Sequence, residues 1–253
     1  MENFHEITFH FVVWYKALMK KLLGILVFTL FTGSAFAVTC HADRNDYFCI
    51  TPEMAPNSPI KLTDFYTIPA RIMGLFNKEL QKTGYPLMLD AQWESPYFGA
   101  GVSFYNEQFR MMILGGTTRI QGMSLDAYAA VVCHEIGHII GGAPHQTMTG
   151  AEWSSSEGQS DFFAASVCLP RYYKAIGELE HNIAKRVEKA GFEMMNSMKE
   201  FDSNSVGQGR KLVRHAVNVT VVKETLINNY PSIQCRYETF RNPAKRASCW
   251  YKE

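Results

Sequence analysis

The chain has almost no net charge. Its 253 residues include 25 lysines and arginines against 24 aspartates and glutamates. A surface that binds nucleic-acid phosphates has to be basic, so this balance argues against that function and we expect no nucleic-acid partner. Internal repeats and low-complexity tracts are also missing. With 47% apolar and 19% charged residues, the composition argues against a disordered chain, a collagen or a coiled coil and is typical of a globular protein.

Long hydrophobic runs are missing too, and the nearest approach to one lies close to the N-terminus. Apolar residues fill 22–31, which is about half the length of a membrane-spanning helix. Three lysines precede this run, namely Lys16, Lys20 and Lys21. An Ala-x-Ala sequence that ends at Ala37 follows it. This layout is typical of a secretory signal peptide, here over residues 1–37.

We therefore expect cleavage after Ala37 and an exported protein, periplasmic or secreted, with no stable membrane span after signal cleavage. An uncleaved signal anchor is the alternative. A signal of this kind usually begins close to its lysines, as it would at Met19, so residues 1–18 are a candidate mis-assigned start. The remaining residues, 38–253, are expected to form a single domain.

No Cys-x-x-Cys motif occurs, which argues against a cysteine zinc site. Six cysteines lie in the part that remains after signal cleavage: Cys40, Cys49, Cys133, Cys168, Cys235 and Cys249. An even number of cysteines in an exported chain indicates disulfide bonds. Many pairings are open to six cysteines, and the sequence alone does not choose among them. Closeness along the chain favours Cys40–Cys49 and Cys235–Cys249, which leaves Cys133 with Cys168.

Hydrophobic spacing predicts a helical segment followed by a small β-sheet. Helical spacing extends over 62–83, where Pro69 predicts a kink or a boundary. Three short apolar runs separated by turn residues predict strands at 87–93, 100–105 and 109–114.

A mostly helical half follows these strands. Ser124 is a suitable N-cap for a helix that ends at Gly141. Further helices are expected at about 155–168, ended by Pro170, at about 172–200 and at about 208–229. The order of helix, small sheet and helices predicts an α+β domain with a mostly helical C-terminal half.

The strongest chemical signal is the sequence His134-Glu135-Ile136-Gly137-His138. Residues four apart on a helix share a face, so both imidazoles can bind the same metal ion. The spacing is that of a catalytic zinc site, in which Glu135 lies beside the open side of the metal. We therefore expect one catalytic zinc ion with His134 and His138 as ligands.

A catalytic zinc ion needs a third protein ligand, and two residues are candidates. Glu157 follows His138 by nineteen residues and begins a Glu-x-x-x-Asp sequence that ends at Asp161. On a helix, Glu157 can bind the metal while Asp161 accepts a hydrogen bond from the far nitrogen of a histidine ligand. His145 is the alternative, but it comes one residue later than the third histidine of a metzincin motif. We expect Glu157 to be the ligand and Asp161 to orient a histidine ligand through this hydrogen bond.

These two motifs resemble those of the gluzincin metallopeptidases, in which His-Glu-x-x-His is followed by Glu-x-x-x-Asp. The number of residues between the motifs is similar to that of thermolysin-like enzymes. The amino-acid sequence of 156–164 instead resembles that of the membrane CAAX-type and HtpX-like peptidases. Those peptidases also carry His-Pro near the C-terminus, with an arginine six residues after the histidine. Here Pro231 and Arg236 match this pattern and Tyr230 replaces the histidine. The resemblance covers roughly 124–240 and lacks the membrane helices of that group.

The resemblance implies a zincin-like α+β fold and an exported zinc metallopeptidase. In such an enzyme Glu135 would act as general base toward a zinc-bound water. Donors that could stabilise the oxyanion are Tyr230, His215, His145 and Arg236, with His215 and Tyr230 taken as the catalytic candidates. Arg236 could equally pair with a carboxylate.

The expected partner is a peptide or protein substrate held along the edge of the sheet, for which 109–114 is the candidate strand. An ordinary core strand is the alternative for these residues. Two other functions stay open. One is a zinc amide hydrolase of a non-peptide substrate, and the other is a non-catalytic binding protein on a peptidase fold.

Overall fold

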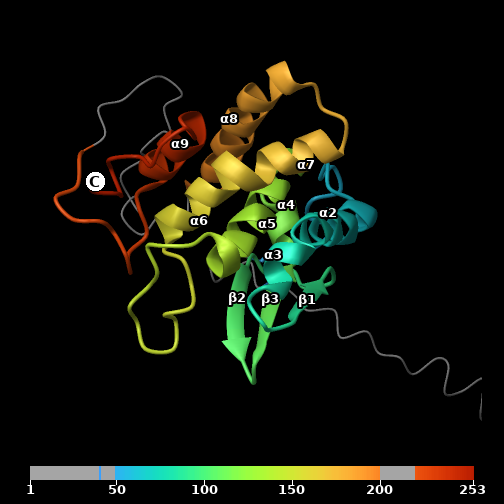
Figure 1. Cartoon of the computed structure of the whole chain (residues 1–253). Helices are drawn as coiled ribbons and strands as arrows, with labels where there is room; N and C mark the ends of the chain where they lie inside the picture. Colours follow the sequence, from blue (N-terminus) through green and yellow to red (C-terminus); the bar gives the residue numbers. More distant parts are fainter. Residues whose placement is uncertain (1–39, 41–48, 200–219) are drawn as a thin grey trace, which may run out of the picture. The chain divides into compact units, whose positions relative to one another are not determined.

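Helices and a small three-stranded sheet make up the protein in the computed structural model, which describes residues 40, 49–199 and 220–253 (Figure 1). The predicted signal peptide and His215 lie outside the described residues. Within the described ranges, no helix is both long enough and apolar enough to cross a membrane. The mixture of helices with one small sheet confirms the predicted α+β composition.

The sheet has the order β1-β3-β2. Its strands are β1 (Leu87–Gln92), β2 (Ala100–Tyr105) and β3 (Gln108–Leu114), close to the predicted limits. β2 and β3 form an antiparallel hairpin, whose turn residues Asn106 and Glu107 both have positive φ, as a two-residue hairpin turn requires. β1 pairs with the other side of β3 in parallel.

Of the two alternatives for 109–114, the ordinary core strand is therefore confirmed and the substrate-binding edge strand is wrong. β3 is the central strand, hydrogen-bonded to a neighbour on each side, and the two edges are β1 and β2. The hairpin follows from its turn residues, but the parallel pairing of β1 with β3 is a long-range contact that leaves no local signal in the sequence.

The first half of the chain contributes α2 (Leu62–Leu75), α3 (Asn77–Gln81) and α4 (Gly116–Arg119). The predicted segment 62–83 divides at Phe76 and not at Pro69, which lies buried inside α2. The central helix is α5 (Leu125–Ile140). The Ser124 hydroxyl accepts a hydrogen bond from the Ala127 backbone N–H at 3.1 Å and so caps α5 as predicted.

In the second half, α6 (Glu157–Phe163), the π-helical turn η2 (Ala164–Cys168) and α7 (Leu169–Ala175) follow one another without a break. The prediction that Pro170 ends a helix is wrong, because this proline directly follows the π-helical turn η2 and the helical run continues through it into α7. The predicted helix over 172–200 is broken after α7, and α8 (Glu180–Ser197) begins beyond Gly177, which has a φ of 87°.

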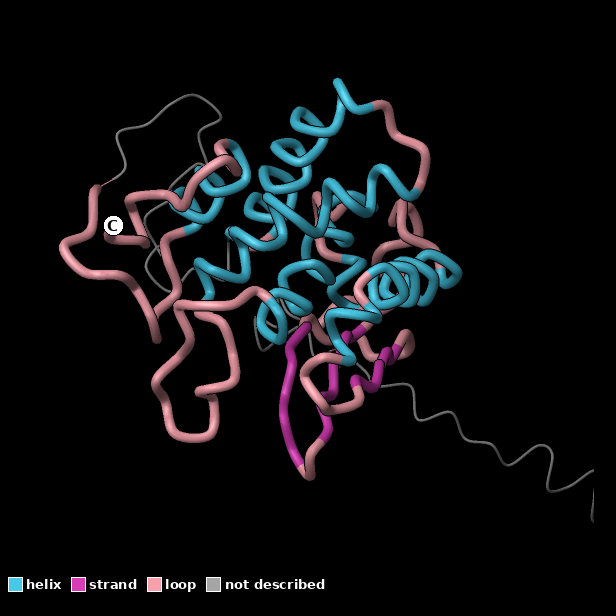
Figure 2. The backbone as a smooth tube through the Cα atoms, in the orientation of Figure 1, coloured by secondary structure: helices cyan, strands magenta, loops and turns pink. Residues whose placement is uncertain are grey.

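The prediction of a helix over 208–229 is wrong for the part of this range that the structure describes. Residues 220–229 are not helical, and 208–219 lie outside the described residues. Instead α9 (Ile233–Arg241) follows, and its Ser232 hydroxyl caps the Cys235 N–H. Figure 2 shows residues 220–232 as a loop, like the connection between α5 and α6.

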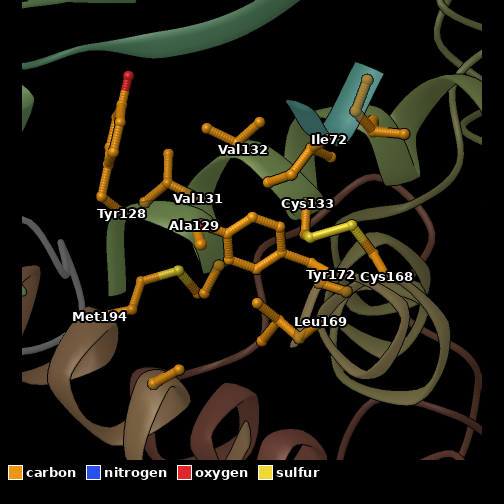
Figure 3. Packing of buried hydrophobic residues seen from close by; sticks show 14 of the residues in the cluster. Ile72, Tyr128, Ala129, Val131, Val132, Cys133, Cys168, Leu169, Tyr172 and Met194 are labelled. Carbon is orange, nitrogen blue, oxygen red and sulfur yellow. A yellow bond between two sulfur atoms is a disulfide. The ribbon is translucent and has the colours of Figure 1, made fainter. Parts of the chain in front are cut away.

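The main hydrophobic core surrounds α5, which is buried on all sides from Ala127 to Ile139. Figure 3 shows side chains of α2, α7 and α8 meeting those of α5, among them Ile72, Leu169 and Met194. A helix enclosed in this way holds its side chains in fixed positions, since native cores are close-packed.

The three predicted disulfide pairings are confirmed: Cys40–Cys49, Cys133–Cys168 and Cys235–Cys249. The bond between Cys133 and Cys168 joins α5 to η2 inside the core (Figure 3). It therefore ties the helix that carries the His-Glu-x-x-His motif to the helical run that begins at Glu157.

We predict that replacing Cys133 and Cys168 by alanine lowers the free energy of unfolding by about 3 kcal/mol or more, since the bond closes a long loop and both residues are core residues. Urea unfolding measures this loss. The matched control replaces Cys40 and Cys49, whose bond closes a shorter loop, and should lose less. Thiol labelling of the unfolded, unreduced protein that finds Cys133 and Cys168 free would contradict the pairing.

Candidate metal centre

The close approach of α6 to α5 creates the site. Gly137 lies in the middle of the His-Glu-x-x-His motif and faces α6, where an added Cβ would come within 2.9 Å of the Ser160 backbone. Any larger residue at position 137 would push the two helices apart. The contact brings Glu157, the first residue of α6, opposite the two histidines of α5.

His134, His138 and Glu157 form a buried group whose potential ligand atoms all lie within 4.8 Å of one another. The Nε2 atoms of the two histidines are 3.1 Å apart. Glu157 Oε2 lies 3.1 Å from His134 Nε2, and Glu157 Oε1 lies 3.7 Å from His138 Nε2. Each of the three residues is less than 10% exposed. The group could therefore hold a metal ion away from bulk solvent.

The hydrogen bonds at the Nδ1 atoms of the two histidines determine which nitrogen of each ring faces Glu157. His134 Nδ1 lies 2.8 Å from Asp161 Oδ1, and His138 Nδ1 lies 2.9 Å from the carbonyl oxygen of Ser155. A carboxylate and a carbonyl only accept, so both Nδ1 atoms carry the proton. Two serine hydroxyls, those of Ser154 and Ser160, also lie 3.0 Å from His138 Nδ1. Each Nε2 is then the ring nitrogen that faces the interior of the site and can bind a metal ion when it carries no proton.

The donor atoms of this group fit a metal ion. At 3.1 Å the two Nε2 atoms need a positive charge between them, which is either a proton on His134 or a bound cation, since two bare lone pairs at this distance would repel each other. Glu157 Oε2 is buried and accepts no well-directed hydrogen bond within the described residues, although His134 Nε2 lies 3.1 Å away. A buried carboxylate oxygen without a well-directed hydrogen bond is costly. A cation bound by two imidazole nitrogens and one carboxylate would satisfy all three groups, and zinc accepts this set of donors.

The electrostatics of the site also favour positive charge. Burial lowers the pKa of His134, but the Asp161 and Glu157 carboxylates outweigh burial and raise it to about 10. Burial and the neighbouring His134 lower the pKa of His138 to about 4. Burial raises the pKa of Glu157, yet the two histidines overcome it and hold the value at about 2. At neutral pH the carboxylates are thus charged and His134 holds a second proton in the metal-free chain, so a metal ion would take the place of that proton beside the carboxylates.

Glu135 lies beside these ligands on α5 and is also buried. Burial raises the pKa of Glu135 to about 7, with His134 opposing the shift and Glu157 adding to it. A carboxyl group with such a pKa can both take up and release a proton near neutral pH.

Arg236 pairs with a carboxylate, which the sequence had left open as one of two roles. From α9 its Nε lies 2.6 Å from Asp161 Oδ2, and its Nη2 lies 2.9 Å from Asp161 Oδ1. Burial raises the pKa of Asp161, but Arg236 and then His134 lower it to about 2. A chain of contacts therefore runs from Arg236 through Asp161 to His134.

The remaining candidates have different positions. The Tyr230 ring lies over the Arg236 guanidinium, with 5.7 Å between the ring centroid and Cζ. Burial of the hydroxyl and the nearby Glu157 carboxylate raise the pKa of Tyr230, although the residue as a whole is 64% exposed. His145 is exposed in the loop after α5 and is not part of the His134 group. His215 lies outside the described residues.

Several supporting residues were not identified from the sequence. The run Ser154-Ser155-Ser156 directly before Glu157 is conspicuous, but its contacts with His138 depend on how the loop after α5 returns to that helix. From the sequence alone, Gly137 is only a residue that weakens a helix, and its role becomes visible in its contact with α6.

Comparison with protein-family models, curated proteins and solved structures found no match to this chain. The geometry alone therefore defines the class of the site, which is a buried His-His-Glu group that could bind a metal ion.

We predict that the wild-type protein binds about one zinc ion and that Glu157→Gln loses most of it, because the glutamine removes the only carboxylate ligand of the site. Metal analysis of the purified chains after zinc loading and desalting measures the difference. The matched control is Glu152→Gln, an exposed carboxylate in the preceding loop, which should keep its metal. Equal zinc in all three chains would exclude Glu157 as a ligand.

Proposed function

We propose that this chain is an exported zinc metallopeptidase that hydrolyses peptide bonds with Glu135 as general base. The observation that carries the proposal is the convergence of two imidazole nitrogens and a buried carboxylate beside a second buried carboxyl group. The likeness of the His-Glu-x-x-His and Glu-x-x-x-Asp motifs to those of gluzincins supports the same assignment.

His134, His138 and Glu157 would hold the zinc ion and leave a further coordination position open. When bound in this way, zinc lowers the pKa of a coordinated water to about 7 and polarises a carbonyl oxygen. Asp161 and the Ser155 carbonyl keep both histidines in the tautomer that binds metal.

Glu135 supplies the proton transfer. A general base works best when its pKa lies near the working pH, and burial brings the pKa of Glu135 to about 7 in the metal-free chain. The carboxylate can take a proton from the attacking water and later pass it to the departing amine nitrogen.

Tyr230 is the better of the described candidates for stabilising the oxyanion. A tyrosine hydroxyl is protonated at neutral pH, and that of Tyr230 lies close to the Glu157 carboxylate, so it can donate a hydrogen bond beside the site. Arg236 uses its Nε and Nη2 on Asp161 and is therefore already engaged. His215 stays an alternative donor from outside the described residues.

The substrate would lie along β2, the edge strand that packs against α5. Leu114 N–H donates to the Gly99 carbonyl at 2.8 Å, which makes these two residues a hydrogen-bonded pair between β2 and β3. Such pairs alternate along an antiparallel ladder. Ala100, Val102 and Phe104 therefore direct their backbone groups away from β3, where an extended peptide can pair with them.

Export is supported by the three disulfide bonds, since such bonds form and persist in oxidising compartments such as the periplasm or the extracellular space. A zinc amide hydrolase acting on a non-peptide substrate would use the same residues. The outer edge of β2 pairs with no other strand among the described residues, and this favours a peptide, because an extended backbone can add to it as a further strand.

The direct test is Glu135→Gln. We predict that peptide cleavage falls by about a hundredfold or more, since general base catalysis contributes factors of this size. Zinc content and thermal stability should stay at wild-type values, because Glu135 is not a ligand in this account. Mass spectrometry of a peptide library after incubation measures the activity.

Full activity in Glu135→Gln would exclude it as the base. Zinc-loaded wild-type protein that cleaves no peptide but hydrolyses another amide would transfer the proposal to the non-peptide alternative. Zinc-loaded protein that cleaves neither would leave a binding function.

A further inference from the structure

We propose that the C-terminal segment, residues 242–253, is a positioning element of the metal centre. It holds the first turn of α6, and with it Glu157 and Asp161, through two side chains, Trp250 and Arg246. The inference rests on the proposed function in one respect only, namely that the His134 group binds metal.

Trp250 lies directly against the residue that follows the carboxylate ligand. It is fully buried, and a Cβ added at Gly158 would overlap its indole ring. The indole Nε1 donates a hydrogen bond to the Thr239 hydroxyl on α9 at 3.2 Å. The indole ring thus lies between α6 and α9, and the position of Glu157 depends on the position of this ring.

Arg246 joins the same turn of α6 to the end of α5. Its Nε donates to Gln159 Oε1 at 2.8 Å, and its Nη2 donates to the Ala143 carbonyl at 3.1 Å. Gln159 Nε2 in turn donates to the Gly141 carbonyl at 2.7 Å. Arg246 therefore helps to set the distance between the helix that carries the histidines and the helix that carries Glu157.

The segment is anchored on the elements that complete the site. Cys249, next to Trp250, is bonded to Cys235, which precedes Arg236 on α9. The Leu226 N–H donates to the Trp250 carbonyl at 2.8 Å, and so fixes the loop that leads to Tyr230. One short segment thus contacts the loop after α5, α6, α9 and the loop before α9.

This contact region is distinct from the main core. Cys235, Cys249 and Trp250 form a small hydrophobic cluster of their own, packed by Phe162 and Tyr251 among others, whereas the main core surrounds α5. Loosening the cluster should therefore displace the ligands more than it weakens the core. Metal affinity is sensitive to such displacement, because ligands have to be held within about 0.5 Å of their bound positions.

The test compares Trp250→Leu with Phe65→Leu in the full chain. Phe65 is equally buried but lies in the main core on α2. Zinc affinity is measured by competition with a chromophoric chelator, and the ligand geometry by the visible absorption of the cobalt-loaded protein. We expect Trp250→Leu to bind zinc about tenfold more weakly or worse, as loss of ligand support generally does, with an altered cobalt spectrum. Phe65→Leu should lose thermal stability but keep both metal properties.

A second pair decides the question if Trp250→Leu does not fold. Arg246→Ala removes the links to Gln159 and Ala143, whereas Arg171→Ala removes a comparable arginine that pairs with Glu79 at 2.7 Å and stacks on Phe76. Only Arg246→Ala should weaken zinc binding. If wild type binds zinc and neither Trp250→Leu nor Arg246→Ala differs from its control, the inference is overturned while the proposed function stands. If the wild-type protein itself binds no zinc, both this inference and the proposed function are wrong.

Discussion

Three lone-pair donors face one point in the interior of this protein, and the surrounding structure follows from the need to hold them there. The Nε2 atoms of His134 and His138 lie 3.1 Å apart, and Glu157 brings a buried carboxylate oxygen to within 3.1 Å of His134 Nε2. Burying such groups without compensation is unfavourable by several kcal/mol. A bound cation removes this cost, which is why the arrangement is informative about function even though no similar protein was found.

Several groups of residues around the site hold these donors in place. The α5 helix is enclosed by the main core, so the two histidines and Glu135 cannot move independently. Behind the histidines, Asp161 and the Ser155 carbonyl define which nitrogen carries the proton. Arg236 balances the charge of Asp161 from α9, and Trp250 packs on Gly158 from the C-terminal segment. The residues that would do the chemistry are close in sequence, whereas the residues that hold them come from the whole second half of the chain.

That division explains what could be predicted from the sequence. His134, Glu135 and His138 follow from helical periodicity, and the Glu157 and Asp161 pair follows from the same periodicity on a second helix. The cysteine pairs followed from closeness along the chain. The central position of β3, the continuation of the helix through Pro170 and the start of α9 at Ile233 depend on long-range packing. The partner of Arg236 was left open for the same reason, since Asp161 lies on a distant helix.

The most direct test of the central claim is X-ray absorption at the zinc edge on the zinc-loaded, purified protein. The account predicts a first shell of nitrogen and oxygen at about 2.0–2.1 Å, with the outer-shell scattering of two imidazole rings and no sulfur. A sulfur shell at about 2.3 Å, or a shell with no imidazole contribution, would show that zinc binds elsewhere in the chain and would contradict the His134–His138–Glu157 site.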